Sequence, residues 1–393
     1  MKNKYADIQN TANNIDESGV DWRQKQFSNP DGIVRLGTSF SGIGAVEHAL
    51  MRLGLKTEIK FAGDIDPYCK KAYFANYKIT EEQWHTDVHE FDASKYKGEI
   101  DLFVGGAPCQ AFSLRGKHGG FEDTRGTLFR EFARIVIECK PKVFIFENVR
   151  GMLSHDKGNT WDVIKNTFEK DCNYQVYYQV LNGKDYGIPQ SRDRIFCIGY
   201  KKSTKIKFPA PIKLEQCIYD YLEPSFDKKY FLKEKGVRFI TKSINREKSY
   251  TQINGNIMLC QKRNQQFNWH GDFIFHPKSL LDESTPLTDE SLFEIDSLDE
   301  NYFIDNQPEK YAIEYIEGKY QMKKESIDNI DVRFGRFRKL TPRECLRLMG
   351  FTDSFKIVVP DTEIYKQAGN SIIVDVLMAI IKQIDITLNS ATL

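Results

Sequence analysis

Residues 34–44 read VRLGTSFSGIG, and this stretch decides the fold. The apolar residues that open it predict a strand, and the apolar positions that recur every three or four residues over 45–53 predict a helix. Between the two, Gly42 and Gly44 allow the backbone to approach a ligand closely. A dinucleotide-binding turn would have a third glycine where Glu47 stands, so the turn favours a smaller cofactor without phosphates.

Short apolar runs alternate with helical patterns as far as about residue 200. Strands are expected at 34–40, 59–62, 102–104, 143–146, 175–181 and 194–198, and helices at 45–53, from Pro67, at 128–139 and at 161–168. Continuous apolar runs are typical of interior parallel strands that are covered on both faces. The order therefore predicts an α/β fold with a doubly wound sheet. Ligands of such sheets bind at the carboxyl ends of the strands.

Changes of pattern divide the chain into four expected regions. They are a polar N-terminal extension (1–31), a catalytic and cofactor-binding domain (32–204), a smaller irregular domain (205–361) and a C-terminal segment that returns to the first domain (362–393). The last region contains an apolar pattern at 372–384 that predicts a helix docked on the first domain.

Composition excludes several classes of protein. The 393 residues are 40% hydrophobic and 28% charged, as in ordinary globular proteins. No run of about 18 apolar residues predicts a membrane span, and the polar first thirty residues lack the apolar core of a signal peptide. Eight scattered cysteines without a Cys-x-x-Cys pair argue against a zinc ribbon or a secreted disulfide scaffold. A cytoplasmic protein is expected.

Charge is distributed unevenly although the net charge is only +1. Residues 333–343 hold five basic and no acidic side chains, and residues 282–309 hold ten acidic and no basic ones. A basic and an acidic face are one interpretation, and ordinary solvated surface is the other. Basic residues at the entry and exit of the smaller domain are candidates for contacts with the phosphates of a nucleic acid: Lys201, Lys202, Lys205, Lys207, Arg333, Arg336 and Arg338.

One cysteine lies where this fold places ligands. Residues 101–113 read DLFVGGAPCQAFS, so an expected strand runs into two glycines and then into Pro108 and Cys109. Pro108 stiffens the turn, and the glycines make a packing role for Cys109 a poor fit. Buried packing is instead expected for Cys139 and Cys197, which lie on apolar faces. The glycine-rich loop at 115–126 suits a lid over substrate, although an ordinary flexible loop has the same composition.

Charged side chains also follow other strands. Glu147 ends the apolar run at 143–146, where a carboxyl group is costly unless it has a partner or a task. Arg192 and Arg194 share one face if their segment is extended, and a surface ion-pair ladder is the alternative interpretation. Asp64 is placed to hold ribose hydroxyls, whereas Asp66, directly before Pro67, is expected to cap a helix.

Together these segments resemble the cytosine-5 DNA methyltransferases, of the bacterial restriction-modification type. The resemblance rests on six motifs in the family's order: FSGIG at 40–44, GAPCQ at 106–110, ENV at 147–149, QxRxR at 190–194, RKLTPRE at 338–344 and QxGN at 367–370. It covers about 34–200 and 338–377. It implies an S-adenosylmethionine-dependent, Rossmann-like methyltransferase domain with a smaller target-recognition domain.

The resemblance assigns catalytic roles. Carbon 5 of cytosine is a weak nucleophile, and a thiolate added at carbon 6 makes it enamine-like. Cys109 would be that nucleophile, and Glu147 would donate to ring nitrogen 3. Arg192 and Arg194 would orient the cytosine carbonyl and the carboxyl group of Glu147. Two further catalytic candidates stand in the same motifs, Gln110 and Asn148. The cytosine would be flipped out of the duplex, because its ring cannot be reached inside it.

The resemblance also assigns the cofactor site. Phe40, Gly42 and Gly44 would follow the methionine part of S-adenosylmethionine. Asp64 would hold the ribose, although the family usually has Glu there. The other assigned residues are Asp87 near the adenine amine, Pro108, and Asn370 from the C-terminal segment. His85 and His89, which flank Asp87, do not make a metal site, since nothing nearby in the sequence supplies further ligands.

Alternatives stay open at this stage. An RNA methyltransferase of the same family would share nearly every motif, and a non-catalytic DNA-binding relative is disfavoured by the intact Cys109, Glu147 and Arg192. A nucleotide-dependent oxidoreductase leaves Cys109 unexplained. The expected partner is double-stranded DNA, read by the smaller domain. A cognate restriction endonuclease that acts on the same site is a further candidate partner. A monomeric enzyme of bacterial or phage origin is expected.

Overall fold

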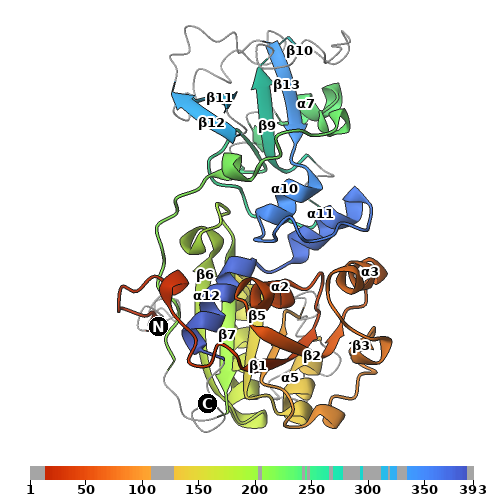
Figure 1. Cartoon of the computed structure of the whole chain (residues 1–393), viewed down its shortest axis with the longest axis vertical. Coiled ribbons are helices and arrows are strands. Elements are labelled where there is room, and N and C mark those ends of the chain that lie inside the picture. Colours follow the sequence, from red (N-terminus) through yellow and green to blue (C-terminus); the bar gives the residue numbers. More distant parts are fainter. Residues whose placement is uncertain are drawn as a thin grey trace.

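The computed structural model describes residues 14–107, 128–201, 206–240, 244–245, 248–264, 269–277, 293–294, 311–316, 319–324 and 334–386. Within these ranges the chain forms a large lower unit built on one sheet and a smaller upper unit, with α10 (Pro342–Arg347) and α11 (Asp361–Asn370) between them (Figure 1).

The lower unit is a seven-stranded sheet in the order β3-β2-β1-β4-β5-β7-β6. Its strands are β1 (Ile33–Ser39), β2 (Lys56–Gly63), β3 (Trp84–His85), β4 (Leu102–Gly105), β5 (Val143–Val149), β6 (Gln175–Asn182) and β7 (Asp193–Tyr200). The first five run parallel, and β7 is antiparallel to both of its neighbours. This confirms the doubly wound α/β fold, with the order reversing between β1 and β4.

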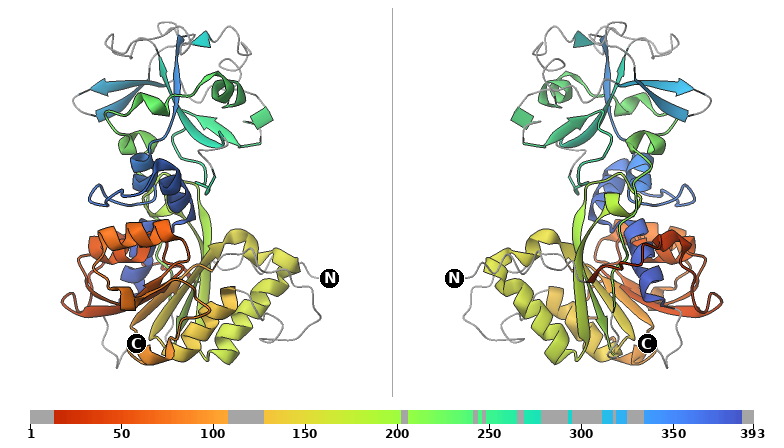
Figure 2. Two further views of the ribbon diagram at one scale, coloured as in Figure 1. Left: turned by 90° about the vertical axis from the view of Figure 1, so that its right-hand side faces the viewer. Right: turned by 90° about the vertical axis from the view of Figure 1, so that its left-hand side faces the viewer.

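Helices cover both faces of this sheet, which Figure 2 shows on edge. One face is covered by α2 (Ala45–Arg52), α3 (Pro67–Asn76) and α12 (Val374–Ile384), the other by α5 (Leu128–Cys139) and α6 (Asn159–Asn166). Successive side chains of a strand point to opposite faces of the sheet, so each strand can contribute to the core on either face. In β1, Leu36 is buried against the α2 and α12 face, and in β4, Phe103 is buried against the α5 face.

The smaller unit holds a four-stranded sheet in the order β10-β13-β9-β8 and a separate hairpin of β11 and β12. Their bounds are β8 (Thr251–Ile253), β9 (Gly271–Pro277), β10 (Phe293–Glu294), β11 (Tyr311–Ile316), β12 (Lys319–Lys324) and β13 (Phe334–Lys339), with α7 (Glu234–Ile240) beside them. Strand β9 serves two cores. Its Phe273 and Phe275 pack with α7 and Phe337, whereas Ile274 faces the core of the lower unit.

The two units meet at α10 (Pro342–Arg347) and α11 (Asp361–Asn370). Thr341 caps α10, and the side chain of Glu344 reaches back to the Thr341 N–H, which is a capping box. Leu346 and Phe351 belong to the core that α2 and α12 share, although the sequence placed 205–361 in the smaller domain. Residues 346–355 therefore pack as a continuation of the lower unit.

The N-terminal extension packs on the end of the chain from residue 14 onward. Ile15 forms a β-bridge with Phe208, and Trp22 is buried in the core of the lower unit. Asp16 pairs with Lys25, and Lys25 also hydrogen-bonds Gln383 on α12. The described part of the extension is therefore a structural element of the sheet unit.

One stretch of the described residues, Asp361–Ile384, is long and apolar enough to cross a membrane by composition. It consists of α11 and α12, which a break at Ser371 separates, and 78% of its most apolar window is buried inside the protein. Such burial is that of a core helix.

Candidate active site

The turn after β1 has a backbone that few residue types adopt. Phe40, Gly42 and Gly44 all have positive φ, at 56°, 55° and 81°. A Cβ on Gly44 would run into the Tyr77 ring, whereas a Cβ on Gly42 would meet no atom within 4 Å. Gly42 therefore borders open space, where a ligand can approach its backbone closely.

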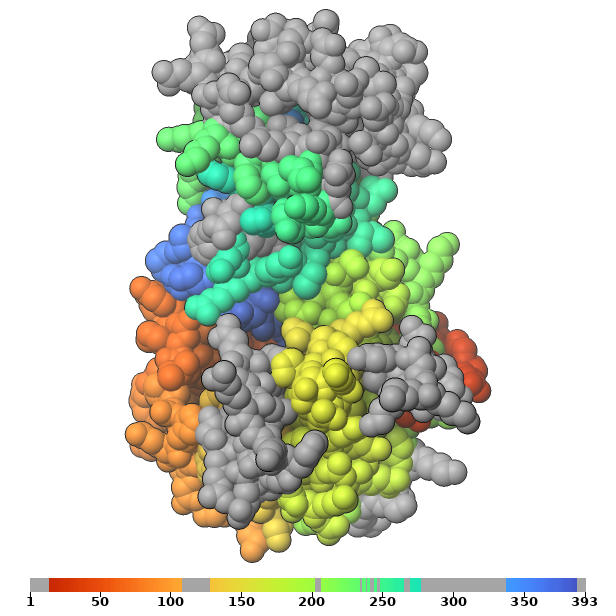
Figure 3. All heavy atoms as spheres, turned by 180° about the vertical axis from the view of Figure 1, so that it is seen from behind, coloured from red at the N-terminus to blue at the C-terminus, as the bar shows by residue number. Residues whose placement is uncertain are grey.

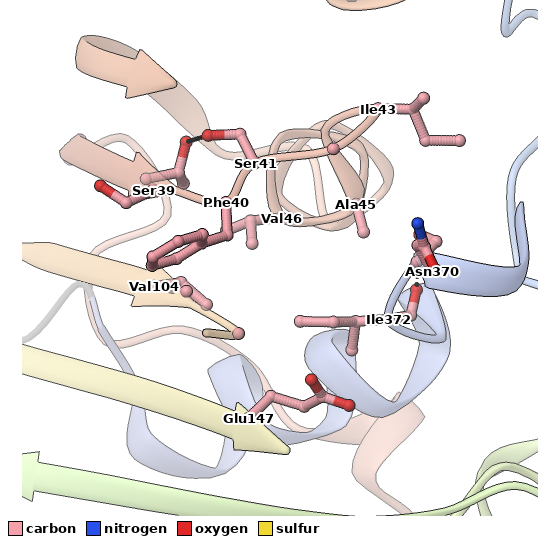
Figure 4. A pocket seen from close by; sticks show the side chains of 15 residues that line it. Ser39, Phe40, Ser41, Ile43, Ala45, Val46, Val104, Glu147, Asn370 and Ile372 are labelled. Atoms are coloured by element: carbon pink, nitrogen blue, oxygen red, sulfur yellow. Dashed lines mark hydrogen bonds between the residues drawn. The ribbon is translucent and has the colours of Figure 1, made fainter. Parts of the chain in front are cut away.

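That open space is a pocket at the carboxyl ends of β1, β4 and β5, with a volume of about 450 Å³ that includes space open to solvent (Figure 4). Its lining combines the turn after β1, the end of β4, the end of β5 and the segment after α11: Thr38, Ser39, Phe40, Ser41, Gly42, Ile43, Ala45, Val46, Val104, Gly105, Gly106, Glu147, Asn370, Ser371 and Ile372. Residues that are more than 300 positions apart in the sequence thus line the same pocket.

The structure brings three of the expected cofactor residues together: Phe40 and Gly42 line the pocket, and Asn370 lines it from the C-terminal segment (Figure 4). Gly44 supports the turn from outside this lining, against the Tyr77 ring. The sequence did not single out Ser371 or Ile372, the next two residues along the chain. The only sequence signal for them is their position directly after the QxGN motif.

Asp64 supports the turn through hydrogen bonds. One carboxylate oxygen accepts from the Gly42 N–H at 2.9 Å, and the other accepts from the Asp66 N–H at 3.0 Å. Burial raises the pKa of Asp64, and these two N–H donors oppose that shift. Asp66 accepts from the Tyr68 N–H and caps α3, which confirms its expected structural role.

Asp87 lies in a different environment. It is half-exposed, outside the lining of the pocket, and accepts hydrogen bonds from the backbone and ring nitrogens of His89, which lower its pKa. His85 turns inward instead, stacks on Phe91 and hydrogen-bonds the Ser39 hydroxyl. The two histidines therefore serve separate local contacts.

Glu147, near the end of β5, faces the pocket (Figure 4). Its Oε1 pairs with Arg194 Nε at 3.1 Å. Burial raises the pKa of Glu147, against the lowering influence of Arg194 and Arg192. Gly106 is adjacent, since a Cβ there would lie 2.8 Å from Glu147 Oε2. A carboxyl group that is costly to ionise therefore stands at the floor of the pocket.

Asn148 fixes the chain that leads to the cysteine motif. Its side-chain amide donates to the Ala107 carbonyl at 2.8 Å, and its side-chain oxygen accepts from the Val149 N–H. Asn148 is buried, so this bond holds Ala107 in place. Pro108, Cys109, Gln110 and the expected lid at 115–126 lie outside the described residues.

The two arginines of the QxRxR motif have different partners. Arg194 pairs with Glu147, whereas the guanidinium of Arg192 donates to the backbone carbonyls of Gln261, Gly369 and Ser371. Arg192 is buried, which with the charge of Arg194 lowers its pKa to about 10. It remains charged at neutral pH.

Two other expectations can be compared with the structure. Arg338 was expected on a phosphate-binding surface, and this is wrong. Its side chain is fully buried, paired with Glu344 at 2.8 Å, and its Nε donates to His276. Lys201 and Lys207 are exposed, as a phosphate contact requires; Lys202, Lys205 and Arg333, and the side chain of Arg336, are not among the described parts. Cys139 and Cys197 are buried in the core, as expected.

Glu47, which stands where a dinucleotide-binding turn has glycine, is buried behind the pocket. Its Oε1 accepts hydrogen bonds from Thr38 and from the Tyr73 hydroxyl, and burial raises its pKa. The position is thus occupied by a side chain that braces the turn from the inside.

The strand order, the glycine turn and the pocket at the carboxyl ends of the strands define a doubly wound α/β domain with a ligand site. The sequence matches the family model described as C-5 cytosine-specific DNA methylase over residues 36–385, and the chain belongs to this family. It is a DNA (cytosine-5-)-methyltransferase, of a family that uses S-adenosylmethionine.

Curated relatives are similar in sequence to this chain over nearly its whole length. Type II methyltransferase M.SsoII of Shigella sonnei is 34% identical, over 92% of this chain and 83% of that protein. Type II methyltransferase M.HhaI of Haemophilus parahaemolyticus is 33% identical, over 89% and 94%. Orphan methyltransferase M.SPRI of Bacillus phage SPR is 30% identical, over 90% and 98%.

Solved structures show the same fold at lower identity. The S. pombe Dnmt2 methyltransferase matches with a TM-score of 0.59 and 18% identity, over 88% of this chain and 97% of that one. The Entamoeba histolytica methyltransferase EhMeth matches with a TM-score of 0.60 and 17% identity, over 89% and 97%.

Proposed function

We propose that the protein transfers the methyl group of S-adenosylmethionine to carbon 5 of a cytosine flipped out of a specific double-stranded DNA sequence, through a covalent adduct with Cys109. The observation that carries this proposal is the position of Glu147. Its carboxyl group, paired with Arg194, stands in the same pocket as the glycine turn and Asn370.

The environment of Glu147 suits a donor to ring nitrogen 3. Addition of the Cys109 thiolate to carbon 6 pushes electrons into the ring, and a proton or hydrogen bond at nitrogen 3 stabilises them. A raised pKa keeps a larger fraction of the carboxyl group protonated. Arg194 pairs with Oε1 of this carboxyl group and is the candidate to reach the cytosine carbonyl.

The residues of the pocket fit S-adenosylmethionine. The turn offers backbone in open space at Gly42 and an apolar wall at Phe40, and no lysine or arginine lines the described pocket to neutralise phosphates. When bound, the cofactor supplies an electrophilic methyl group. Phe40, Gly42, Gly44 and Asn370 would hold it, with Asp64 at the ribose. Asp87 is a candidate for the adenine amine, and Pro108 completes the proposed set.

We assign DNA contacts to the smaller unit and the exposed Lys201 and Lys207, and expect a monomer in the bacterial cytoplasm, where its DNA substrate is. The relatives named type II methyltransferases make a cognate restriction endonuclease a reasonable partner to test for.

Trapping tests the covalent step. Release of the enzyme requires loss of the proton on carbon 5, and fluorine cannot leave as a cation. A duplex with 5-fluorocytosine at the target should therefore hold the wild-type protein, with cofactor, through denaturing electrophoresis. Cys109→Ser should give almost no adduct, because a hydroxyl is scarcely ionised at neutral pH. Glu147→Gln should trap far more slowly while still binding DNA.

To identify the target sequence, a random-sequence DNA library is methylated and then sequenced for methylcytosine. An RNA library treated in the same way tests RNA as the alternative substrate. Methylation of RNA alone would replace DNA by RNA as substrate. A cross-link on any other cysteine, or a wild-type rate for Cys109→Ser, would contradict the mechanism.

A further inference from the structure

The guanidinium of Arg192 joins two segments that are far apart in the sequence. Its Nη1 donates to the Gln261 carbonyl at 2.6 Å, and its Nη2 donates to the carbonyls of Gly369 at 3.0 Å and Ser371 at 2.8 Å. The side chain is 3% exposed. All of these acceptors are backbone atoms, so Arg192 determines where two pieces of chain lie.

The first piece presents a pocket residue. Gly369 and Ser371 flank Asn370, and both Asn370 and Ser371 line the pocket beside Phe40 and Gly42. One nitrogen of Arg192 therefore holds the chain on either side of Asn370. Any movement of this turn toward or away from a cofactor must move or break bonds to Arg192.

The second piece, residues 258–264, comes from the smaller unit. The Gln261 N–H donates to the side chain of Gln190, and Met258 forms a β-bridge with Gln190. Lys262 and Arg263 follow and are exposed. In Figure 3 the teal atoms of this region lie across the seam between the smaller unit and the catalytic unit. Two adjacent exposed cations suit DNA phosphates.

The two pieces also touch each other directly. A Cβ on Gly369 would lie 2.5 Å from the backbone nitrogen of Arg263 and 2.5 Å from the carbonyl carbon of Lys262. The two backbones are therefore in close contact, and the Arg192 bonds fix how they lie against each other. The Sγ of Cys260 lies 3.7 Å from Arg192 and 3.9 Å from Arg194, which extends the cluster to the partner of Glu147.

We infer that Arg192 is a positioning residue that couples the cofactor pocket to the DNA-binding segment 258–264. A cofactor that fixes Asn370 fixes the Arg192 bonds, and these hold Lys262 and Arg263 where they meet phosphate. By linkage, DNA tightens the cofactor by the same factor. This inference rests on the proposed function for its two ligands. It replaces direct contact with cytosine as the role of Arg192.

Arginine is required for this geometry. Its planar fork presents five N–H donors, enough for three carbonyls on two segments, whereas a lysine ammonium is a single point charge. Arg192→Lys should keep the buried charge and lose part of the coupling, and Arg192→Met should lose all of it.

The experiment is a binding cycle. The affinity for a fluorescent duplex carrying the target is measured by anisotropy with and without S-adenosylhomocysteine, which binds as the cofactor does but cannot react. The affinity for S-adenosylhomocysteine is measured by calorimetry with and without DNA. For the wild type we expect each ligand to tighten the other at least about fivefold, the lower end of typical coupling. The factor should fall to about one in Arg192→Met, with an intermediate value in Arg192→Lys.

Arg347→Met is the matched control. Arg347 also joins distant segments by donating to the carbonyls of Tyr221 and Leu222, and among the described residues its hydrogen bonds reach none that line the pocket. It should keep the wild-type coupling. Arg263→Gln should weaken DNA binding and reduce the slope of log affinity against log salt by about one, with cofactor binding in the absence of DNA unchanged.

Wild-type coupling in Arg192→Lys and Arg192→Met would overturn the inference, as would a wild-type enzyme that methylates DNA without any coupling. Arg192→Lys serves if Arg192→Met does not fold. A wild-type protein that neither binds nor methylates DNA would instead overturn the proposed function, and the inference with it.

Discussion

Gly106→Ala tests whether Glu147 acts from the position that the structure gives it. The added methyl group would lie 2.8 Å from Glu147 Oε2. Nonbonded heavy atoms prefer about 3.5 Å, so the carboxyl group must retreat by about 0.7 Å. A misplacement of about 1 Å in a catalytic group can cost about 100-fold in rate. We therefore expect the single-turnover rate of methyl transfer to fall about 10- to 100-fold.

The fold should be nearly unaffected, because Oε2 is the free end of a flexible side chain. Thermal unfolding should report a loss of no more than about 0.5 kcal/mol, as for substitutions that leave the core alone. Gly105→Ala is the control, since its methyl group would meet the Ser39 carbonyl of β1 at 2.6 Å and must push on backbone. That variant should lose about 1–3 kcal/mol of stability.

The assay follows transfer of a labelled methyl group to saturating target duplex at saturating cofactor, with the unfolding curve of each variant beside it. A Gly106→Ala enzyme that methylates at the wild-type rate would refute the assigned position of Glu147. Unfolding of Gly106→Ala as severe as that of Gly105→Ala would show that the glycine serves folding rather than the carboxyl group.

Three further outcomes are expected. Arg338→Met should destabilise the protein by about 3–5 kcal/mol in denaturant unfolding, because it leaves the buried Glu344 charge unpaired, and adding Glu344→Leu should restore part of that loss. Asp64→Ala should weaken S-adenosylmethionine binding by about 1–3 kcal/mol in calorimetry, and Asp64→Glu should retain most of it; wild-type affinity in Asp64→Ala would make the residue purely structural. Acid should destabilise the fold, because buried histidines with lowered pKa values bind protons mainly when unfolded. Each such histidine should lower the free energy of unfolding by about 1 kcal/mol between pH 7.5 and 5.5. Unfolding curves that do not change over that range would contradict this prediction. These histidines are His48, His85 and His276, with pKa values of about 4, 4 and 3.

The sheet unit could be predicted closely from the sequence. The helix expected at 128–139 is α5 with the same bounds, because its apolar period is long and regular. Strand β3 was missed, since two residues, Trp84 and His85, leave no period to detect. The strands of the smaller unit were missed as well. Their segments are short and mix polar with apolar residues, so that only tertiary pairing defines them.

For the site, the sequence predicted most of the candidate catalytic and cofactor-binding residues, but it did not predict all of the groups that they contact. Asn370 was expected beside Phe40, and the structure places both in one pocket. Arg338 was misinterpreted because a basic run is usually solvated. The signal that could have corrected it is Glu344, which the T-x-x-E capping box turns back toward the strand end. The carbonyl partners of Arg192 are backbone atoms, and these leave no signature in a sequence.

The double role of β9 limits how the smaller unit could be exchanged for that of a related methyltransferase. Phe273 and Phe275 belong to one core and Ile274 to the other, so a grafted unit must enter this strand with its alternation in phase. A transplant that is out of step by one residue would turn both phenylalanines toward the core of the lower unit and leave the core of the smaller unit unfilled. Recombination points outside β9, or insertions of an even number of residues within it, should be the ones that survive selection.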